Sequence, residues 1–213
     1  KIAFNVLNYG RFKLAAMCTG GAKFTVAEAA QYAASRRQFG QPIASFGAIR
    51  HKLAEMAVRT YASEAMLYRT TGLIDHTIDG SHDPKVVAGA LEEFAIEASI
   101  LKVASSEMVD FVVDENVQVH GGNGFVADYP AERRYRDARV NRIFEGTNEI
   151  NRLLIPGMLV KRALKGGLPL IAAAKAVRDE LMSPAAPDAG GGGPLAEERR
   201  VVVGMKKTTL AAM

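Results

Sequence analysis

The residue best placed for acid–base chemistry is Glu145, which lies in the segment IFEGTNEI at residues 143–150. Apolar residues precede it, and a glycine and an expected helix start follow it. A carboxylate in such a place is partly desolvated, which suits a general base. The same carboxylate could instead cap the helix start, and the amides of that start could receive an anion. From these residues alone the capping interpretation is favoured.

Two further segments could bind an anionic or flat ligand. Arg36 and Arg37 lie beside Gln38 and a glycine, and such a group can hold a phosphate through charge-assisted hydrogen bonds. The alternative is a solvated charge pair, which the spacing alone favours. The segment GGNGF at 121–125 is too rich in glycine to be helical. It could let a ligand approach the backbone, or it could be only a helix C-cap and turn.

The spacing of apolar residues predicts the elements that position these groups. We expect one helix from Ala3 to about Ser35, and a kink at Gly20–Gly21 unless packing holds that point. Gly40 and Pro42 end this helix. The later helices are expected from Ser45, as N-cap, to about Asp75; from Pro84, behind a capping Asp83, to about Val119; and from Gly146 to about Leu164, with a short helix or turn after Pro130.

Four main helices in antiparallel sequence predict an all-α fold, an antiparallel four-helix bundle. We expect this bundle to occupy residues 1–166. Residues 167–213 are expected to be a linker and the start of a partial helical C-terminal extension. In this extension a helix at 169–182 precedes a flexible linker at 183–194, and a second helix occupies 195–213.

Composition narrows the class of protein without choosing a ligand. Of the 213 residues, 48% are apolar and 23% are charged, as in ordinary globular proteins. The net charge of +4 fits a polyanion or an anionic ligand equally well. The single cysteine, Cys18, excludes an intrachain disulfide and thiol-rich metal sites, so we predict no metal site and a reducing compartment.

No apolar run reaches the roughly 18 to 20 residues of a membrane span. The chain opens inside an expected helix without Met, which favours a fragment.

Several segments, taken together, resemble the C-terminal helical domain of acyl-CoA dehydrogenases over roughly residues 1–165. They are RRQFGQPIASFGAIRHKLAEMA at 36–57, VQVHGGNGF at 117–125 and DYPAERRYRDARVNRIFEGTNEINR at 128–152. Each motif is weak alone, and their joint occurrence in this order is specific. The opening LNYGRF and the presence of a tail after residue 166 look most like the very-long-chain branch.

The resemblance implies a reaction and a base. Members of this family bind FAD and a saturated acyl-CoA, remove an α-proton with a glutamate, and pass the β-hydride to the flavin. The product is the trans-2-enoyl-CoA, and an electron-transfer flavoprotein reoxidises the flavin. The matching base is Glu145, whose backbone N–H would also donate to the thioester oxygen. A minority branch carries its base at a position that matches Gly10, and glycine cannot serve.

The resemblance also assigns binding residues. Asn8, Arg11 and Gly146 match positions at the substrate, the first two near the thioester end of coenzyme A. Other matches concern the cofactor: Arg36, Gln38, Phe39, Gln118 and Gly122 would reach the FAD of a neighbouring subunit, and Thr147 and Glu149 the subunit's own FAD. Shared sites of this kind require a homodimer or homotetramer.

Three other functions stay open at this point. An acyl-CoA oxidase would have the same fold, and a helical assembly module could keep the surface without the chemistry. A nucleic-acid-binding bundle is the most distant, because no binding motif is present. We expect a bacterial cytoplasmic protein, with the mitochondrial matrix as the alternative. We also expect the isolated chain to bind FAD weakly or not at all and to have no turnover.

Overall fold

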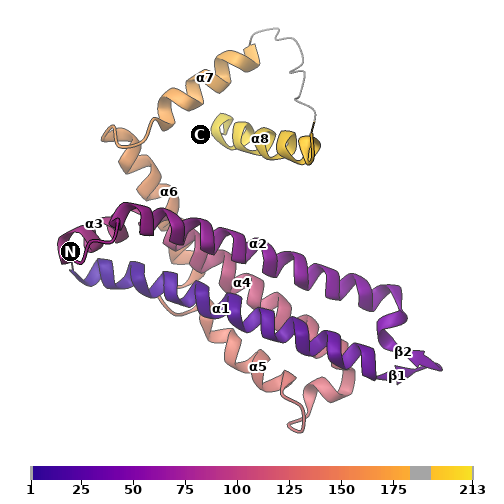
Figure 1. The fold of residues 1–213 in the computed structure, drawn as a ribbon. Coiled ribbons are helices and arrows are strands. Elements are labelled where there is room, and N and C mark those ends of the chain that lie inside the picture. The colour runs from indigo at the N-terminus through magenta and orange to yellow at the C-terminus, as the bar shows by residue number, and fades with distance from the viewer. Residues whose placement is uncertain (1, 183–192, 213) are drawn as a thin grey trace. The chain divides into compact units, whose positions relative to one another are not determined.

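The computed structural model describes residues 2–182 and 193–212, and in them the predicted all-α fold is confirmed (Figure 1). The helices are α1 (Ile2–Ser35), α2 (Gly47–Ile78), α3 (Pro84–Glu93), α4 (Ala95–His120), α5 (Ala131–Ala138), α6 (Asn148–Leu164), α7 (Leu170–Met182) and α8 (Ala196–Ala211). Three short 3-10 turns are η1 (Ile43–Ser45), η2 (Gly121–Phe125) and η3 (Arg139–Arg142). Strands β1 (Arg37–Gln38) and β2 (Gln41–Pro42) form a small antiparallel hairpin.

The chain forms two compact units, residues 1–156 and 157–213. The predicted boundary near residue 166 stays a prediction. In the first unit α1, α2 and α4 lie side by side, and the chain reverses direction between successive long helices (Figure 1). Their shared core consists mainly of small and aliphatic side chains: Leu14, Cys18, Ala22, Ala29, Ala33, Met56, Met108, Val109, Val112, Val113, Val119 and Ala138.

Hydroxyl groups also join the three long helices inside this core. The Thr19 hydroxyl on α1 lies 3.0 Å from that of Ser63 on α2, and Ser63 lies 2.9 Å from the hydroxyl of Ser105 on α4. All three side chains are buried, so each hydroxyl needs such a partner. The chain of hydroxyls fixes the register of the helices more specifically than aliphatic contacts alone.

Helix α1 continues through Gly20–Gly21 without interruption. Both glycines are exposed, while Cys18, Thr19 and Ala22 around them are buried against the other long helices. Packing on either side of the pair therefore compensates for the poor helix propensity of glycine.

Two predicted helix boundaries are wrong. Ser45 does not cap α2; it closes η1, and Phe46 occupies the N-cap position without a side-chain cap. The helix predicted from Pro84 to Val119 is divided at Phe94, whose ψ is 24° instead of the roughly −42° of a continuous helix. No glycine or proline marks this break, so the apolar pattern continues across it. The predicted cap at Asp83 is confirmed, because its side chain accepts from the Lys85 backbone N–H at 2.8 Å.

The hairpin between α1 and α2 was not predicted. Phe39 and Gly40 form its two-residue turn with φ values of 51° and 82°. Positive φ at both positions matches the tight hairpin turn whose twist suits antiparallel strands. Phe39 is 90% exposed and holds a conformation that is unfavourable for a side chain with Cβ. A strained, exposed aromatic at a loop tip suggests a role beyond folding.

The second unit contains the predicted helices at 169–182 and 195–213, observed as α7 and α8. Lys207 on α8 pairs with Glu180 on α7. The predicted linker at 183–194 lies outside the described residues except for its last two positions. Of the helices in the described ranges, none has the length and apolar character needed to cross a bilayer.

Candidate functional site

The Glu145 side chain is held in a tight turn between η3 and α6. Glu145 and Gly146 both have left-handed backbone conformations, with φ values of 57° and 82°. The turn directs the Glu145 carboxyl group against Gly10 of α1. A Cβ built on Gly10 would lie 2.5, 2.7 and 2.6 Å from the two carboxyl oxygens and the carboxyl carbon of Glu145. The carboxylate therefore occupies the place that a side chain at position 10 would take.

Three buried polar side chains hold the carbonyl groups of this turn. Arg11 Nε donates to the Glu145 carbonyl at 3.1 Å, and Lys102 Nζ donates to the Gly146 carbonyl at 2.8 Å. The Asn151 side-chain amide lies 2.9 Å from the Gly146 carbonyl and 3.1 Å from the Thr147 carbonyl. Buried acceptors must be satisfied, so these contacts determine the path of the turn.

The two cations beneath the turn, Arg11 and Lys102, are buried, and burial disfavours the charged form of a side chain. Arg11 is 6% exposed and Lys102 is fully buried. Burial lowers the pKa of Arg11, and the nearby charge of Glu145 offsets part of this effect. Burial, followed by the positive charge of Arg11, lowers the pKa of Lys102. A fold that keeps two such cations beside a half-buried carboxylate has the character of a functional site.

Further polar residues support this arrangement. Arg11 Nη1 also donates to Asn8 Oδ1 and to the Ser99 hydroxyl, each at 3.3 Å. The Asn8 amide donates to the Leu91 carbonyl at 3.4 Å. Asn8 is only 7% exposed, so this network is internal.

Residues Thr147 and Glu149, rather than Glu145, cap α6. The Thr147 hydroxyl accepts from the Ile150 backbone N–H at 3.3 Å. Hydrogen bonds from its own backbone N–H and from the Thr147 hydroxyl lower the pKa of Glu149. The side chain of Glu145 is thus released from the capping role that its sequence position suggested.

Four of the predicted cofactor residues meet at a different place, at the hairpin end of the bundle. Arg36, Gln38, Phe39 and Gly122 line an open cavity of about 380 Å³. Gln118 is exposed nearby on α4 and is not among the lining residues. This cavity and the Glu145 turn lie at opposite ends of α1, since Gly10 and Ser35 are separated by roughly 38 Å of helix. The structure therefore divides the predicted residues into two groups.

The wall of this cavity is built from Tyr32 and His120. Their rings stack with centroids 3.9 Å apart, and His120 Nδ1 lies 2.8 Å from the Asn116 carbonyl. His120 is therefore packed and hydrogen-bonded. Tyr32 also donates to the His120 carbonyl and accepts from the Asn123 amide at 2.9 Å. These contacts hold the segment GGNGF against α1.

The glycines of that segment have distinct physical requirements. Gly121 ends α4 with φ 59°. A Cβ at Gly124 would lie 2.4 Å from the Val117 carbonyl, so no side chain fits there. The segment is a helix C-cap and turn, and it also exposes backbone to the cavity at Gly122. The C-cap and turn are confirmed, and the approach of a ligand to this backbone stays a prediction.

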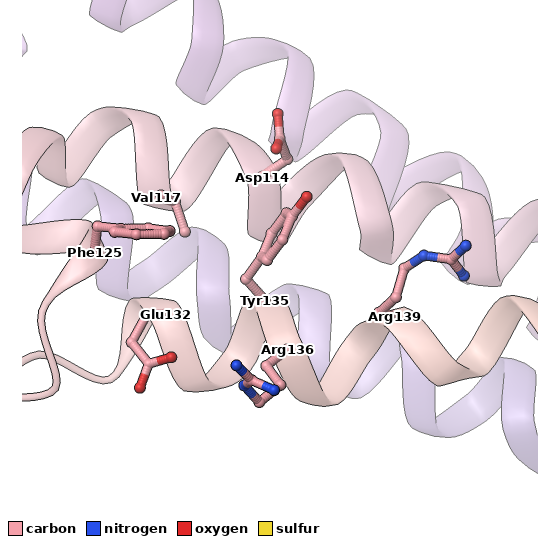
Figure 2. Close-up of a pocket in the computed structure, with 7 residues that line it drawn as sticks. All are labelled: Asp114, Val117, Phe125, Glu132, Tyr135, Arg136 and Arg139. Atoms are coloured by element: carbon pink, nitrogen blue, oxygen red, sulfur yellow. The ribbon is translucent and has the colours of Figure 1, made fainter.

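A larger hollow of about 760 Å³ lies between α4 and α5 (Figure 2). Its lining consists of Asp114, Val117, Phe125, Glu132, Tyr135, Arg136 and Arg139. Along α4, Asp114 is roughly 18 Å from Lys102. None of the predicted site residues lines this hollow, and its charged lining consists of two acidic and two basic side chains. The Glu145 turn is the better candidate site, because three buried polar side chains converge on the backbone that carries one half-buried carboxylate.

Lys102 and Asn151 were missed by sequence reasoning. The one available signal was a lysine between Leu101 and Val103 in a helix that is apolar or small around it. A lysine that falls on the buried face of a helix needs a partner there, and that requirement points to a polar site. Asn151 had no comparable signal, because asparagine near a helix start is common.

The described fold is an all-α bundle that holds a half-buried glutamate over a glycine, with a cavity of about 380 Å³ near the other end of α1. A family model for the acyl-CoA dehydrogenase C-terminal domain matches residues 1–159. The chain therefore belongs to the acyl-CoA dehydrogenase family.

Individual relatives agree with this assignment. A probable acyl-CoA dehydrogenase of Bacillus subtilis (strain 168) is 47% identical over 216 residues, which cover 99% of this chain and 36% of that protein. The very long-chain specific mitochondrial acyl-CoA dehydrogenase of Homo sapiens is 41% identical over 155 residues, or 73% of this chain and 22% of that protein. The crystal structure of acyl-CoA dehydrogenase complexed with FAD from Bacillus anthracis has a TM-score of 0.95 and 50% identity, over 99% of this chain and 36% of that one. The chain thus spans about a third of its full-length bacterial relatives.

Proposed function

We propose that this chain is the base-carrying helical part of a flavin-dependent acyl-CoA dehydrogenase that oxidises a saturated acyl-CoA to the trans-2-enoyl-CoA. The observation that carries the proposal is the Glu145 carboxylate, which lies free of the α6 cap and against Gly10. In this arrangement the carboxylate is available to a proton on a bound substrate. The family membership supports the same reaction.

The role of Glu145 follows from the acidity of the substrate. The α-proton of a thioester is too weakly acidic for an exposed carboxylate, so the base must be desolvated and the developing enolate oxygen must be hydrogen-bonded. Glu145 takes the α-proton, and the backbone N–H of the same residue donates to the thioester oxygen. The β-carbon gives up a hydride as the α,β double bond forms. FAD, when bound, supplies the acceptor for that hydride.

We place the substrate residues Asn8, Arg11 and Gly146 around this base. The direct contacts of Arg11 within the chain are to the Glu145 turn, Asn8 and Ser99, which supports a role at the thioester end of coenzyme A. Gly146 has φ 82°, and a Cβ there would lie 3.2 Å from the Asn151 amide. Glycine at position 146 therefore lets the turn adopt its left-handed conformation and pack closely on Asn151.

The cavity at the hairpin end fits one part of a flavin dinucleotide. Its exposed Arg36 guanidinium would hold the pyrophosphate, and the exposed Phe39 ring would pack near the adenine. Gln38, Gln118 and Gly122 would contact the same half. Because this cavity lies about 38 Å along α1 from the base, we propose that it serves the FAD of a neighbouring subunit. Thr147 and Glu149 would serve the subunit's own FAD. Sharing of this kind requires a homodimer or a homotetramer.

The proposal also covers the protein that reoxidises the flavin and the branch of the acyl-CoA dehydrogenase family. We propose an electron-transfer flavoprotein as the acceptor, and membership of the very-long-chain branch, which the 41% identity to the human enzyme supports. We place the protein in a bacterial cytoplasm, because the relative that matches nearly the whole chain is bacterial.

Product analysis of the complete protein that carries this chain tests the reaction. Incubation with saturated acyl-CoA thioesters and an artificial electron acceptor should yield 2-enoyl-CoA, detected by mass spectrometry as a loss of two hydrogens. In air without that acceptor, a dehydrogenase should form little hydrogen peroxide. Stoichiometric peroxide would instead identify an acyl-CoA oxidase, and absence of product with every thioester would leave the helical assembly module as the better account.

A further inference from the structure

We propose that Lys102 is a positioning residue for the base: its buried ammonium group holds the Glu145 turn in the shape that aims the carboxylate at the substrate. The inference rests on the proposed function. Lys102 does not contact the Glu145 carboxylate directly, and it acts through the backbone of the turn.

The contacts of Lys102 are all with the turn and with the start of α6. Its Nζ donates to the Gly146 carbonyl at 2.8 Å and to Asn148 Oδ1 at 2.6 Å. Both acceptors are neutral. The described residues place no carboxylate within ion-pair distance of Lys102, although its side chain is fully buried. The charge is therefore compensated only by two neutral oxygens and by carboxylates farther away.

Stability alone does not explain a lysine at this position. A buried cation without a direct counter-ion is destabilising relative to an apolar side chain of the same size. Both of its acceptors also have another donor group within reach. Asn151 donates to the Gly146 carbonyl, and the Ser106 hydroxyl lies 3.2 Å from Asn148 Oδ1 and 3.0 Å from the Val103 carbonyl, either of which can accept its hydrogen. A methionine at position 102 would fill the same space and leave each oxygen a donor within reach. The retained charge points to a role in the site.

Peptide geometry shows what that role is. In a planar trans peptide group the N–H points away from the C=O. Arg11 holds the Glu145 carbonyl, Lys102 holds the Gly146 carbonyl, and Asn151 holds the Thr147 carbonyl. The N–H groups of these peptide groups, which belong to Gly146, Thr147 and Asn148, therefore face the opposite side. The Glu145 N–H belongs to the preceding peptide group, so Lys102 acts on it, as on the carboxylate, through the shape of the turn.

The position of Lys102 among other charges is compatible with this effect. The titratable groups that face it are Arg11 and Cys18 from α1, Glu145 in the turn and Glu149 at the start of α6. Arg11 opposes the positive charge of Lys102, while the two glutamates favour it. Lys102 and Arg11 together thus form a positive support beneath a turn that must bind a developing oxyanion.

The test compares three variants of the complete protein. Lys102→Met removes the charge and both hydrogen bonds, whereas Lys102→Gln keeps an N–H donor without the charge. Ser105→Ala is the matched control, because Ser105 is fully buried on the same helix and bonds to Ser63 rather than to the turn. For each protein we would measure the melting temperature, the FAD content, the rate of flavin reduction by saturated acyl-CoA, and the dissociation constant of the thioester.

A second readout separates positioning from hydride transfer. A 3-oxoacyl-CoA has an acidic α-proton and cannot be dehydrogenated in the same way, so its enolate, detected by ultraviolet absorbance, reports the base and the oxyanion donors alone. We expect Lys102→Met to lower the bound enolate fraction and to slow flavin reduction by about 10- to 100-fold, the size typical of a misplaced catalytic group. Thioester affinity should change less than about threefold, and Lys102→Gln should recover part of the rate.

The results of these measurements either support or contradict the positioning role of Lys102. Ser105→Ala should lower the melting temperature without changing the enolate fraction. If Lys102→Met reduces flavin as fast as wild type, or if it loses only stability and FAD like a structural residue, the inference is wrong. If the wild-type protein itself is not reduced by any acyl-CoA, the proposed function fails instead.

Discussion

At the scale of single residues, the site depends on a glycine as much as on a glutamate. Glu145 can reach across to α1 only because Gly10 has no side chain, since any Cβ there would lie within 2.7 Å of the carboxylate. The proposed base and the residue that makes room for it are 135 positions apart in the sequence. A change at Gly10 should therefore affect catalysis more than folding.

The substitution Gly10→Ala tests this dependence. The added methyl group should displace the Glu145 carboxylate and slow flavin reduction by about 10- to 100-fold, with little effect on thioester binding. The helix itself should be slightly stabilised, because alanine is the better helix former by up to about 1 kcal/mol. The measurements are stopped-flow flavin reduction and thermal unfolding.

Gly20→Ala, on the same helix, is the control for this experiment. No atom lies within 4 Å of a Cβ built there, so this variant should share the stabilisation and keep the full rate. Equal rates for Gly10→Ala and wild type would mean that the carboxylate does not work from the position seen here.

The single cysteine should be chemically inert in the folded protein. Cys18 is 2% exposed, and burial raises the pKa of its thiol to about 12. The reactive thiolate is therefore scarce at mildly alkaline pH, and reagents cannot reach it. We expect no alkylation of the Cys18 peptide by iodoacetamide in native buffer, followed by mass spectrometry, and full alkylation in denaturant. Rapid native alkylation would show that α1 separates readily from the bundle.

Some of these residue-level features could be predicted from the sequence and some could not. Glu145 stands out because a recognisable motif surrounds it. Its neighbour Gly10 is visible as a glycine in a helix, but its contact with Glu145 depends on how α1 packs against a turn far along the chain. Lys102 looks like any helix lysine until the buried face of α4 is known. Long-range packing, rather than local pattern, decides these roles.

At the scale of elements, most helices follow from local signals. The break at Phe94 does not, because the residues around it have ordinary helix propensity and neither glycine nor proline marks the point. The hairpin at 37–42 was missed for a different reason. Its turn needs a positive φ at Phe39. Phenylalanine rarely adopts a positive φ, so its presence in the sequence does not predict such a turn.

The N-cap of α3 offers a direct test of an element predicted from sequence. Asp83→Ala removes the acceptor for the Lys85 N–H and should destabilise α3 locally by about 1 kcal/mol. Hydrogen exchange of the α3 amides, followed by mass spectrometry, should accelerate while α4 stays protected. Asp83→Asn should behave like wild type, because asparagine caps equally well. Unchanged exchange in Asp83→Ala would show that packing, not the cap, holds this helix start.

At the scale of the whole molecule, the two groups of predicted site residues lie too far apart to meet one flavin within one chain. The hairpin cavity and the Glu145 turn are joined by the length of α1, a rigid element of roughly 38 Å between them. We propose that a second subunit resolves this separation. Motifs in the sequence predicted both groups of residues, and the fold shows that the two groups lie apart.

Subunit hybrids test this arrangement. One chain carries Glu145→Gln and the other carries Arg36→Ala with Phe39→Ala, both exposed positions whose loss should not unfold the bundle. Each variant alone should have little activity. In a mixed dimer, one of the two sites combines an intact Glu145 with an intact hairpin from the partner, so activity should return. No recovery in verified hybrids would mean that each chain binds FAD through its own hairpin.

The most direct test of the account compares wild type and Glu145→Gln of the complete protein during anaerobic mixing with saturated acyl-CoA thioesters. Flavin absorbance reports reduction, and a separate titration reports thioester binding. We predict rapid bleaching in the wild type and a loss of at least about 1,000-fold in Glu145→Gln, with binding retained, because glutamine keeps the shape but cannot accept the proton. Equal bleaching of both proteins would contradict the assignment of Glu145 as the base.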